Sequence, residues 1–124
     1  MGNFANTVTG TTSVTGTIDT ITGLTGTRTF TNTVTVNAGG TFNLSGLNPP
    51  VSFGANITNN SANTLNAGSG AVTFSANLSL LGTGPITFGQ NPVSIVAGRT
   101  ITNGNTNAGT GVTFGGLTIA SPTT

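Results

Sequence analysis

Three side chains carry all the charge in this 124-residue sequence: Asp19, Arg28 and Arg99. The chain has no histidine, cysteine or tyrosine. General acid–base catalysis needs a group that titrates near neutral pH, usually a histidine or a carboxylate pair, and Asp19 has no second side-chain carboxylate to pair with. A serine or threonine nucleophile also lacks a histidine or lysine to activate it. The sequence therefore predicts that the protein is not an enzyme.

Binding chemistry that depends on charge or on metal ligands is excluded in the same way. Zinc, iron and tight calcium sites need thiolates, imidazoles or several carboxylates, so we expect no metal and no cofactor. Nucleic-acid binding needs basic side chains for several phosphates, and the net charge is only +1. No stretch approaches the about 20 apolar residues of a membrane helix, so no membrane insertion is expected.

The most regular spacing in the chain belongs to threonine. A threonine occupies every second position from residue 25 to residue 35. Threonine is β-branched and suits a strand, and its hydroxyl can face water or bond to a neighbouring hydroxyl. We interpret the segment as one uncharged strand face, suited to assembly or to ice binding, formed by Thr25, Thr27, Thr29, Thr31, Thr33 and Thr35.

The composition indicates an ordered β protein that tends to associate. Only 34% of the residues are hydrophobic, yet valine, isoleucine and phenylalanine alternate with hydroxyl residues in a way that disordered segments do not. Since only 2% of the residues are charged, copies of the chain repel one another weakly. No cysteine is present, which rules out disulfide bonds.

Four similar blocks recur along the chain. They are VSFGANIT from Val51, VTFSANLS from Val72, VSIVAGRTIT from Val93 and VTFGGLTIA from Val112, with starts 21, 21 and 19 residues apart. We expect one internal stack of the four starting valines, and a second of the apolar residues two positions later. The full predicted core stack is Val51, Phe53, Ile57, Val72, Phe74, Leu78, Val93, Ile95, Ile101, Val112, Phe114 and Leu117.

Short strands, Asn/Gly-rich corners and a period near 20 residues predict a single parallel β-solenoid with coils of about 19–21 residues and no helices. A β-sandwich is the alternative, because short strands at similar spacing also suit that fold. Recurrence of whole blocks, corners included, favours the solenoid.

The first third of the chain lacks this block. We divide the chain into a Thr/Gly-rich strand region, residues 1–35, and a solenoid repeat domain, residues 36–124. The first region is interpreted either as a degenerate coil or as a strand exchanged with a neighbouring subunit.

Two segments, Thr35–Gly46 (TVNAGGTFNLSG) and Thr64–Phe88 (TLNAGSGAVTFSANLSLLGTGPITF), resemble the repeats of filamentous-haemagglutinin-type adhesins and autotransporter passengers. The resemblance covers roughly residues 35–119. It implies a right-handed β-helix and a structural or adhesive role at a bacterial surface.

The ends of such a solenoid would expose unpaired backbone groups, and no capping element is evident in the sequence. We therefore expect a structural subunit of an extracellular filament that polymerises head to tail with itself. The alternatives are an ice-binding solenoid and an adhesin module that binds cell-surface glycans. The location expected is extracellular or cell-surface, and since no signal-peptide pattern is visible the chain would be a mature form or a fragment.

Overall fold

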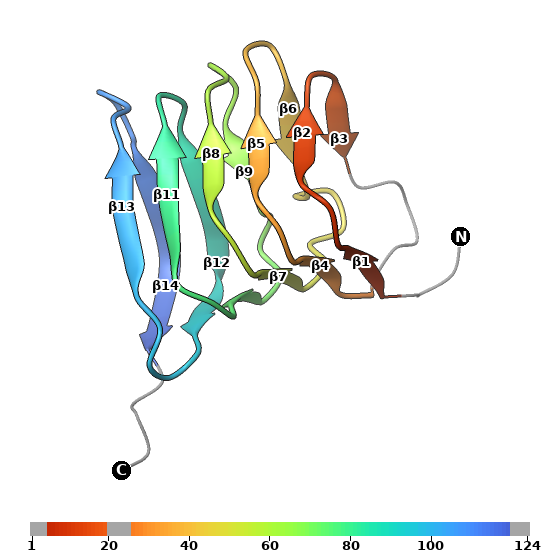
Figure 1. Cartoon of the computed structure of the whole chain (residues 1–124), viewed down its shortest axis with the longest axis vertical. Coiled ribbons are helices and arrows are strands. Elements are labelled where there is room, and N and C mark those ends of the chain that lie inside the picture. Colours follow the sequence, from red (N-terminus) through yellow and green to blue (C-terminus); the bar gives the residue numbers. More distant parts are fainter. Residues whose placement is uncertain (1–4, 20–25, 120–124) are drawn as a thin grey trace.

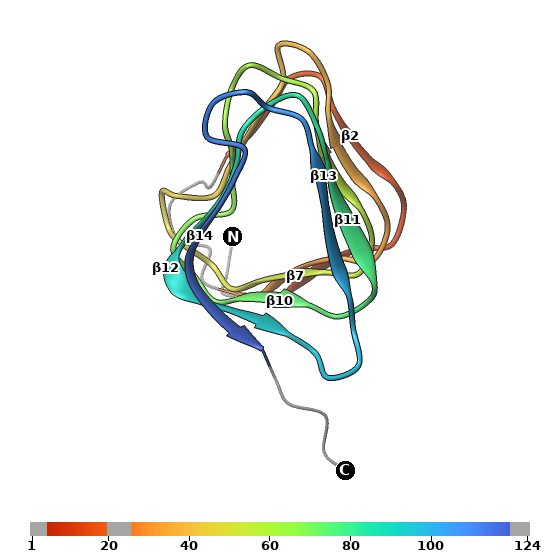
Figure 2. The ribbon, with the colours of Figure 1, turned by 90° about the vertical axis from the view of Figure 1, so that its left-hand side faces the viewer.

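The computed structural model describes residues 5–19 and 26–119, which form a stack of three-sided coils (Figure 1). Viewed along the stack, the coils superimpose on a roughly triangular outline (Figure 2). The strands in chain order are β1 (Asn6–Val8), β2 (Thr12–Val14), β3 (Thr17–Asp19), β4 (Arg28–Phe30), β5 (Val34–Val36), β6 (Thr41–Asn43), β7 (Val51–Phe53), β8 (Ile57–Asn59), β9 (Leu65–Asn66), β10 (Val72–Phe74), β11 (Leu78–Gly82), β12 (Ile86–Ile95), β13 (Ile101–Asn105) and β14 (Val112–Ile119).

Each side of the triangle is a parallel stack of strands. The first face contains β1, β4, β7, β10 and residues 93–95 of β12, followed by residues 117–119 of β14. The second face contains β2, β5, β8, β11 and β13. The third contains β3, β6, β9, residues 86–88 of β12 and residues 112–114 of β14.

This architecture confirms the predicted all-β solenoid and excludes the β-sandwich. Every strand pairing in the described part of the chain is parallel, whereas a sandwich is built from antiparallel sheets. No helix occurs in residues 5–19 or 26–119, so no helix in these ranges crosses a membrane.

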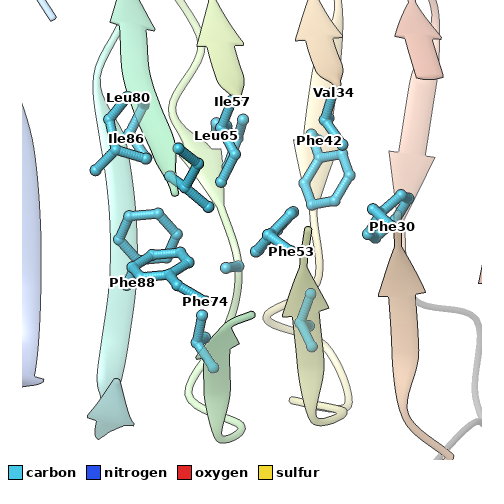
Figure 3. Close-up of a cluster of buried hydrophobic side chains, with 14 of the residues drawn as sticks. Phe30, Val34, Phe42, Phe53, Ile57, Leu65, Phe74, Leu80, Ile86 and Phe88 are labelled. Atoms are coloured by element: carbon cyan, nitrogen blue, oxygen red, sulfur yellow. The ribbon is translucent and has the colours of Figure 1, made fainter. Parts of the chain in front are cut away.

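The interior follows from two-residue alternation within each short strand. In β7, Val51 and Phe53 are buried while Ser52 between them is partly exposed, and most of the inner strands repeat this in–out–in pattern. The inward residues fill a narrow core that contains a chain of phenylalanines (Figure 3). The ring centroids of Phe74 and Phe88 are 5.2 Å apart at an edge-to-face angle of 85°, an arrangement that aromatic pairs favour.

Paired residues in successive coils are 21–26 residues apart, which exceeds the predicted 19–21 at most positions, and the last block lies on a different face from the one expected. Val51 pairs with Val72, and Val72 with Val93, each 21 residues along, but Val93 then pairs with Leu117, which is 24 residues further on. Val112 instead pairs with Ile86 on the third face. The predicted 19-residue step and the fourfold valine stack were therefore wrong at their last member.

Asparagine side chains form hydrogen bonds that connect the corners of neighbouring coils. The Nδ2 of fully buried Asn59 donates to the carbonyl oxygens of Pro85 (2.7 Å) and Asn63 (2.9 Å), and its Oδ1 accepts from the amide of Ser61. Glycine fits beside this corner, because a Cβ on Gly82, which has φ +101°, would lie 2.1 Å from the carbonyl oxygen of Asn59. Corner residues thus satisfy polar groups that burial would otherwise leave unpaired.

The first described residues form a coil of the same kind. β1, β2 and β3 pair in register with β4, β5 and β6. The predicted boundary between residues 35 and 36 falls inside β5, so the structure shows no change of architecture at that position.

Candidate functional site

The most distinctive surface is the end coil formed by β13 and the 112–114 segment of β14. Within the described residues, each of these segments pairs with a strand on one side only: β13 with β11, and residues 112–114 with residues 86–88. The outer backbone groups of these segments therefore have no neighbouring strand in the part of the chain that the structure describes. An edge of this kind is a template for pairing with another chain.

Apolar side chains lie beside these open strand edges. Ile101, Val112 and Phe114 are only partly buried although all three pack against the core. The ring of Phe114 stacks on that of fully buried Phe88, with centroids 5.2 Å apart and an interplanar angle of 15°. The end coil therefore continues the aromatic core to the end of the stack.

A cavity of about 370 Å³ opens at the same end. Most of its lining is apolar, and Arg99, Thr100 and Asn103 supply the polar part; the remaining residues are Leu80, Ile95, Ile101 and Phe114. No carboxylate, histidine or cysteine is among these seven lining residues. The chemistry of the cavity is the burial of apolar surface against a complementary shape.

The opposite end of the stack is formed by β1, β2 and β3. Val8 is 39% exposed, Ile18 is partly buried and Val14 is buried. Thr12 points its hydroxyl into a buried position where it makes no hydrogen bond. The three strands at this end contain no aromatic residue, whereas the end formed by β13 and β14 contains Phe114.

Most of the predicted core residues whose side chains the structure describes lie in the interior, but the last member of each of the two predicted columns is a different residue. On the second face, Ile57 pairs with Leu80 and Leu78 pairs with Ile101. Phe114 pairs with Phe88 on the third face, whereas Ile95 pairs with Ile119 on the first. Leu117, as described above, continues the column of Val51, Val72 and Val93.

The threonine segment is not one strand. Thr29 lies in β4 and Thr35 in β5, on two different faces, and Thr31 and Thr33 belong to the corner between them. Thr27 precedes β4, and Thr25 lies outside the described residues. Thr31 uses its hydroxyl to donate to the carbonyl oxygen of Val8 in the preceding coil (3.1 Å). The predicted single strand face is therefore wrong, because the chain bends within it.

A different hydroxyl array is present that the sequence pattern did not reveal. On the first face, the central outward residue of each strand from β1 to residues 93–95 of β12 carries a hydroxyl group. We call this set the hydroxyl ladder; its paired members are Thr7, Thr29, Ser52, Thr73 and Ser94. The signal was the middle letter of the repeated VSF, VTF and VSI strings, one per coil.

Metal-ligating residues do not gather in the described part of the chain. No group of three or more acidic, histidine or cysteine residues occurs in residues 5–19 and 26–119 that could hold a metal ion. Asp19 lies in β3 and Arg28 in β4, near one end, while exposed Arg99 borders the cavity at the other.

Comparison with known proteins adds no identity. No family model, no curated protein and no solved structure matches this chain. The resemblance to bacterial adhesin repeats therefore stays a prediction.

Proposed function

We propose that this protein is a structural subunit that polymerises end to end, coil upon coil, into a filament. The observation that carries the proposal is the end coil, where the open edges of β13 and β14 surround partly exposed Ile101, Val112 and Phe114. A second copy placed on this end would pair with the strand edges and cover the apolar side chains. The same main-chain pairing that joins coils within the chain would then join copies.

The low charge supports this proposal. A net charge of +1 gives little repulsion between approaching copies, and charged edge residues are a common means by which sheets avoid such pairing. In β13 the sequence ITNGN has no charged residue and no proline. We place such filaments outside the cell or at its surface, in line with the resemblance to surface-fibre repeats.

A proline at position 103 tests the proposal at the edge itself. The amide of Leu78 donates to the carbonyl of Thr100 and the amide of Thr106 donates to the carbonyl of Gly82, so the alternate amides of residues 102, 104 and 106 serve β11. By the same alternation, the amide of Asn103 points to the open edge. Asn103→Pro therefore removes an outward donor and leaves the pairing with β11 in place.

Asn103→Ala is the matched control, because it removes the same side chain, including its hydrogen bond to the amide of Asn105, but keeps the backbone amide. We expect Asn103→Pro to lose filament growth and Asn103→Ala to keep it, in electron microscopy and size-exclusion chromatography at equal concentration. Equal filament formation by both variants would contradict assembly through this edge.

A second candidate function, ice binding, is favoured by the hydroxyl ladder. It presents one outward hydroxyl per coil on the first face, at the about 4.8 Å spacing of adjacent strands, and Thr31 and Ser75 add hydroxyls beside it. Regular, uncharged threonine arrays on a flat sheet resemble those of ice-binding solenoids.

Thermal hysteresis of the Asn103→Pro variant, which is expected to remain monomeric, tests this second function apart from assembly. If the ladder binds ice, Thr73→Lys on the first face abolishes the hysteresis and Thr58→Lys on the second face does not. Absence of hysteresis in the Asn103→Pro variant with the ladder intact would rule the function out.

A further inference from the structure

Each end of the solenoid has a step, because the chain advances along the stack by one strand spacing, which we call one level, as it passes the three faces of a coil. The first coil runs from β1 through β2 to β3, and the chain then continues into β4, which pairs with β1 one level higher. The step at this end therefore lies at the corner between the third and the first face.

At the other end the step lies at a different corner. The last three segments of the described chain are β13 on the second face, residues 112–114 on the third, and residues 117–119 on the first. The 117–119 segment lies one level above residues 93–95, and no described segment lies one level above β13. This step is therefore at the corner between the first and the second face.

The steps at the two ends lie at different corners because the described chain does not contain a whole number of coils. The described chain contains fourteen strands, of which β12 and β14 each occupy two faces, giving sixteen segments on three faces. Five complete coils use fifteen segments, and residues 117–119 are the sixteenth. Two copies stacked without rotation would place β1 of one copy at the level and face that residues 117–119 of the other already occupy.

We infer that consecutive subunits of the filament are rotated by one face, about one third of a turn, so that the two steps meet. The inference rests on the proposed end-to-end polymerisation. In this joint β1 of the next copy pairs with β13, its β2 with residues 112–114, and its β3 with residues 117–119. No strand is displaced and all three faces continue through the joint.

The side chains on the two ends agree with this placement. Val8 is 39% exposed on the inward side of β1, and it would cover the end of the core next to partly buried Ile101. Val14 of β2 would lie over Val112 and Phe114, which pack against the core but remain partly exposed. The joint thus adds the missing layer over the apolar cavity.

The helical symmetry of the filament follows from the segment count. Sixteen segments at three per coil, with adjacent strands about 4.8 Å apart, give an axial rise of about 25 Å per subunit, with about one third of a turn. The orientation therefore repeats every three subunits, and the fourth subunit has the orientation of the first.

Engineered cysteines test the rotation, because the chain has no cysteine of its own. Thr7, Ser13 and Thr102 are exposed, outward positions on β1, β2 and β13. In the rotated joint Thr7 lies beside Thr102 of the neighbouring copy, at a strand spacing that a disulfide bridges; in an unrotated joint Ser13 takes that place. Within one chain these positions lie at opposite ends of the stack, so every disulfide formed is between copies (Figure 1).

The experiment compares oxidised filaments of two double variants on a denaturing gel. Thr7→Cys with Thr102→Cys is expected to give ladders of covalent oligomers, and Ser13→Cys with Thr102→Cys is expected to give none. Ladders from the Ser13 pair, or filaments with ladders from neither, would overturn the rotation while leaving polymerisation intact. If both variants and the unsubstituted protein stay monomeric, the proposed function is refuted, and this inference is refuted with it.

Discussion

The interior coils and the end coil at β13 and β14 use the same residue types but differ in how they are covered. Phe74 and Phe88 are fully buried, whereas Phe114, in the same aromatic chain, is partly exposed. Asn59 is fully buried at its corner, whereas Asn105, which occupies the equivalent position two coils later, is only partly buried. The end coil therefore carries interior side chains without a described coil that would bury them, which is why we propose it as the assembly surface.

The largest expected effect is the difference in free energy of unfolding between a substitution in the interior and one in the end coil. Phe88→Ala removes a fully buried ring that lies 5.2 Å from both Phe74 and Phe114, and it should lower the free energy of unfolding by about 3–5 kcal/mol. Phe114→Ala should cost about 1–2 kcal/mol, because part of that ring is already in water. Chemical denaturation of both variants in the Asn103→Pro background, which is expected not to polymerise, measures the difference. Equal losses would mean that the end coil is covered as well as the interior.

A smaller effect is expected at the corners. Asn59→Ala leaves the carbonyl oxygen of Pro85 and the amide of Ser61 without this partner in a buried site, at a cost of about 2 kcal/mol. Asn105→Ala removes hydrogen bonds to Gly84 and to the amide of Asn107, and water can replace them, so the cost should be about 1 kcal/mol. Thermal unfolding monitored by circular dichroism distinguishes the two, and a larger loss for Asn105→Ala would contradict the comparison.

The smallest effect is expected on the faces. Thr73→Val keeps the β-branched shape of an outward residue and removes only its hydroxyl, so the stability should change by less than about 0.5 kcal/mol. Filament length and number, counted by electron microscopy, should also stay unchanged, because the proposed joint uses strand edges at the ends. A loss of filaments in this variant would place the assembly surface on the first face instead.

Much of the fold could be predicted because alternation within three-residue strands is a local property. The alternation of apolar and polar residues in Val51–Phe53 predicts which side chains face the core. The recurrence of whole blocks indicates that the strands stack in parallel. Which face a block occupies is not local. The strings at Val72 and Val112 read almost alike, yet one lies on the first face and the other on the third, because both faces require the same in–out–in pattern.

The prediction of a single strand for the threonine segment was wrong for a related reason. Alternation continues through the corner at Thr31 and Thr33, so a bent path and a straight strand give the same spacing of residue types. The candidate site was predicted only in the form of two uncapped ends. The open edge of β13 and the step between faces depend on the complete registers, which no single segment contains.

Electron microscopy of the purified chain over rising concentration, with size-exclusion chromatography alongside, tests the central claim most directly. We predict unbranched filaments one molecule wide whose number increases with concentration, built from coils about 4.8 Å apart. A monodisperse monomer at the highest concentration would contradict end-to-end polymerisation.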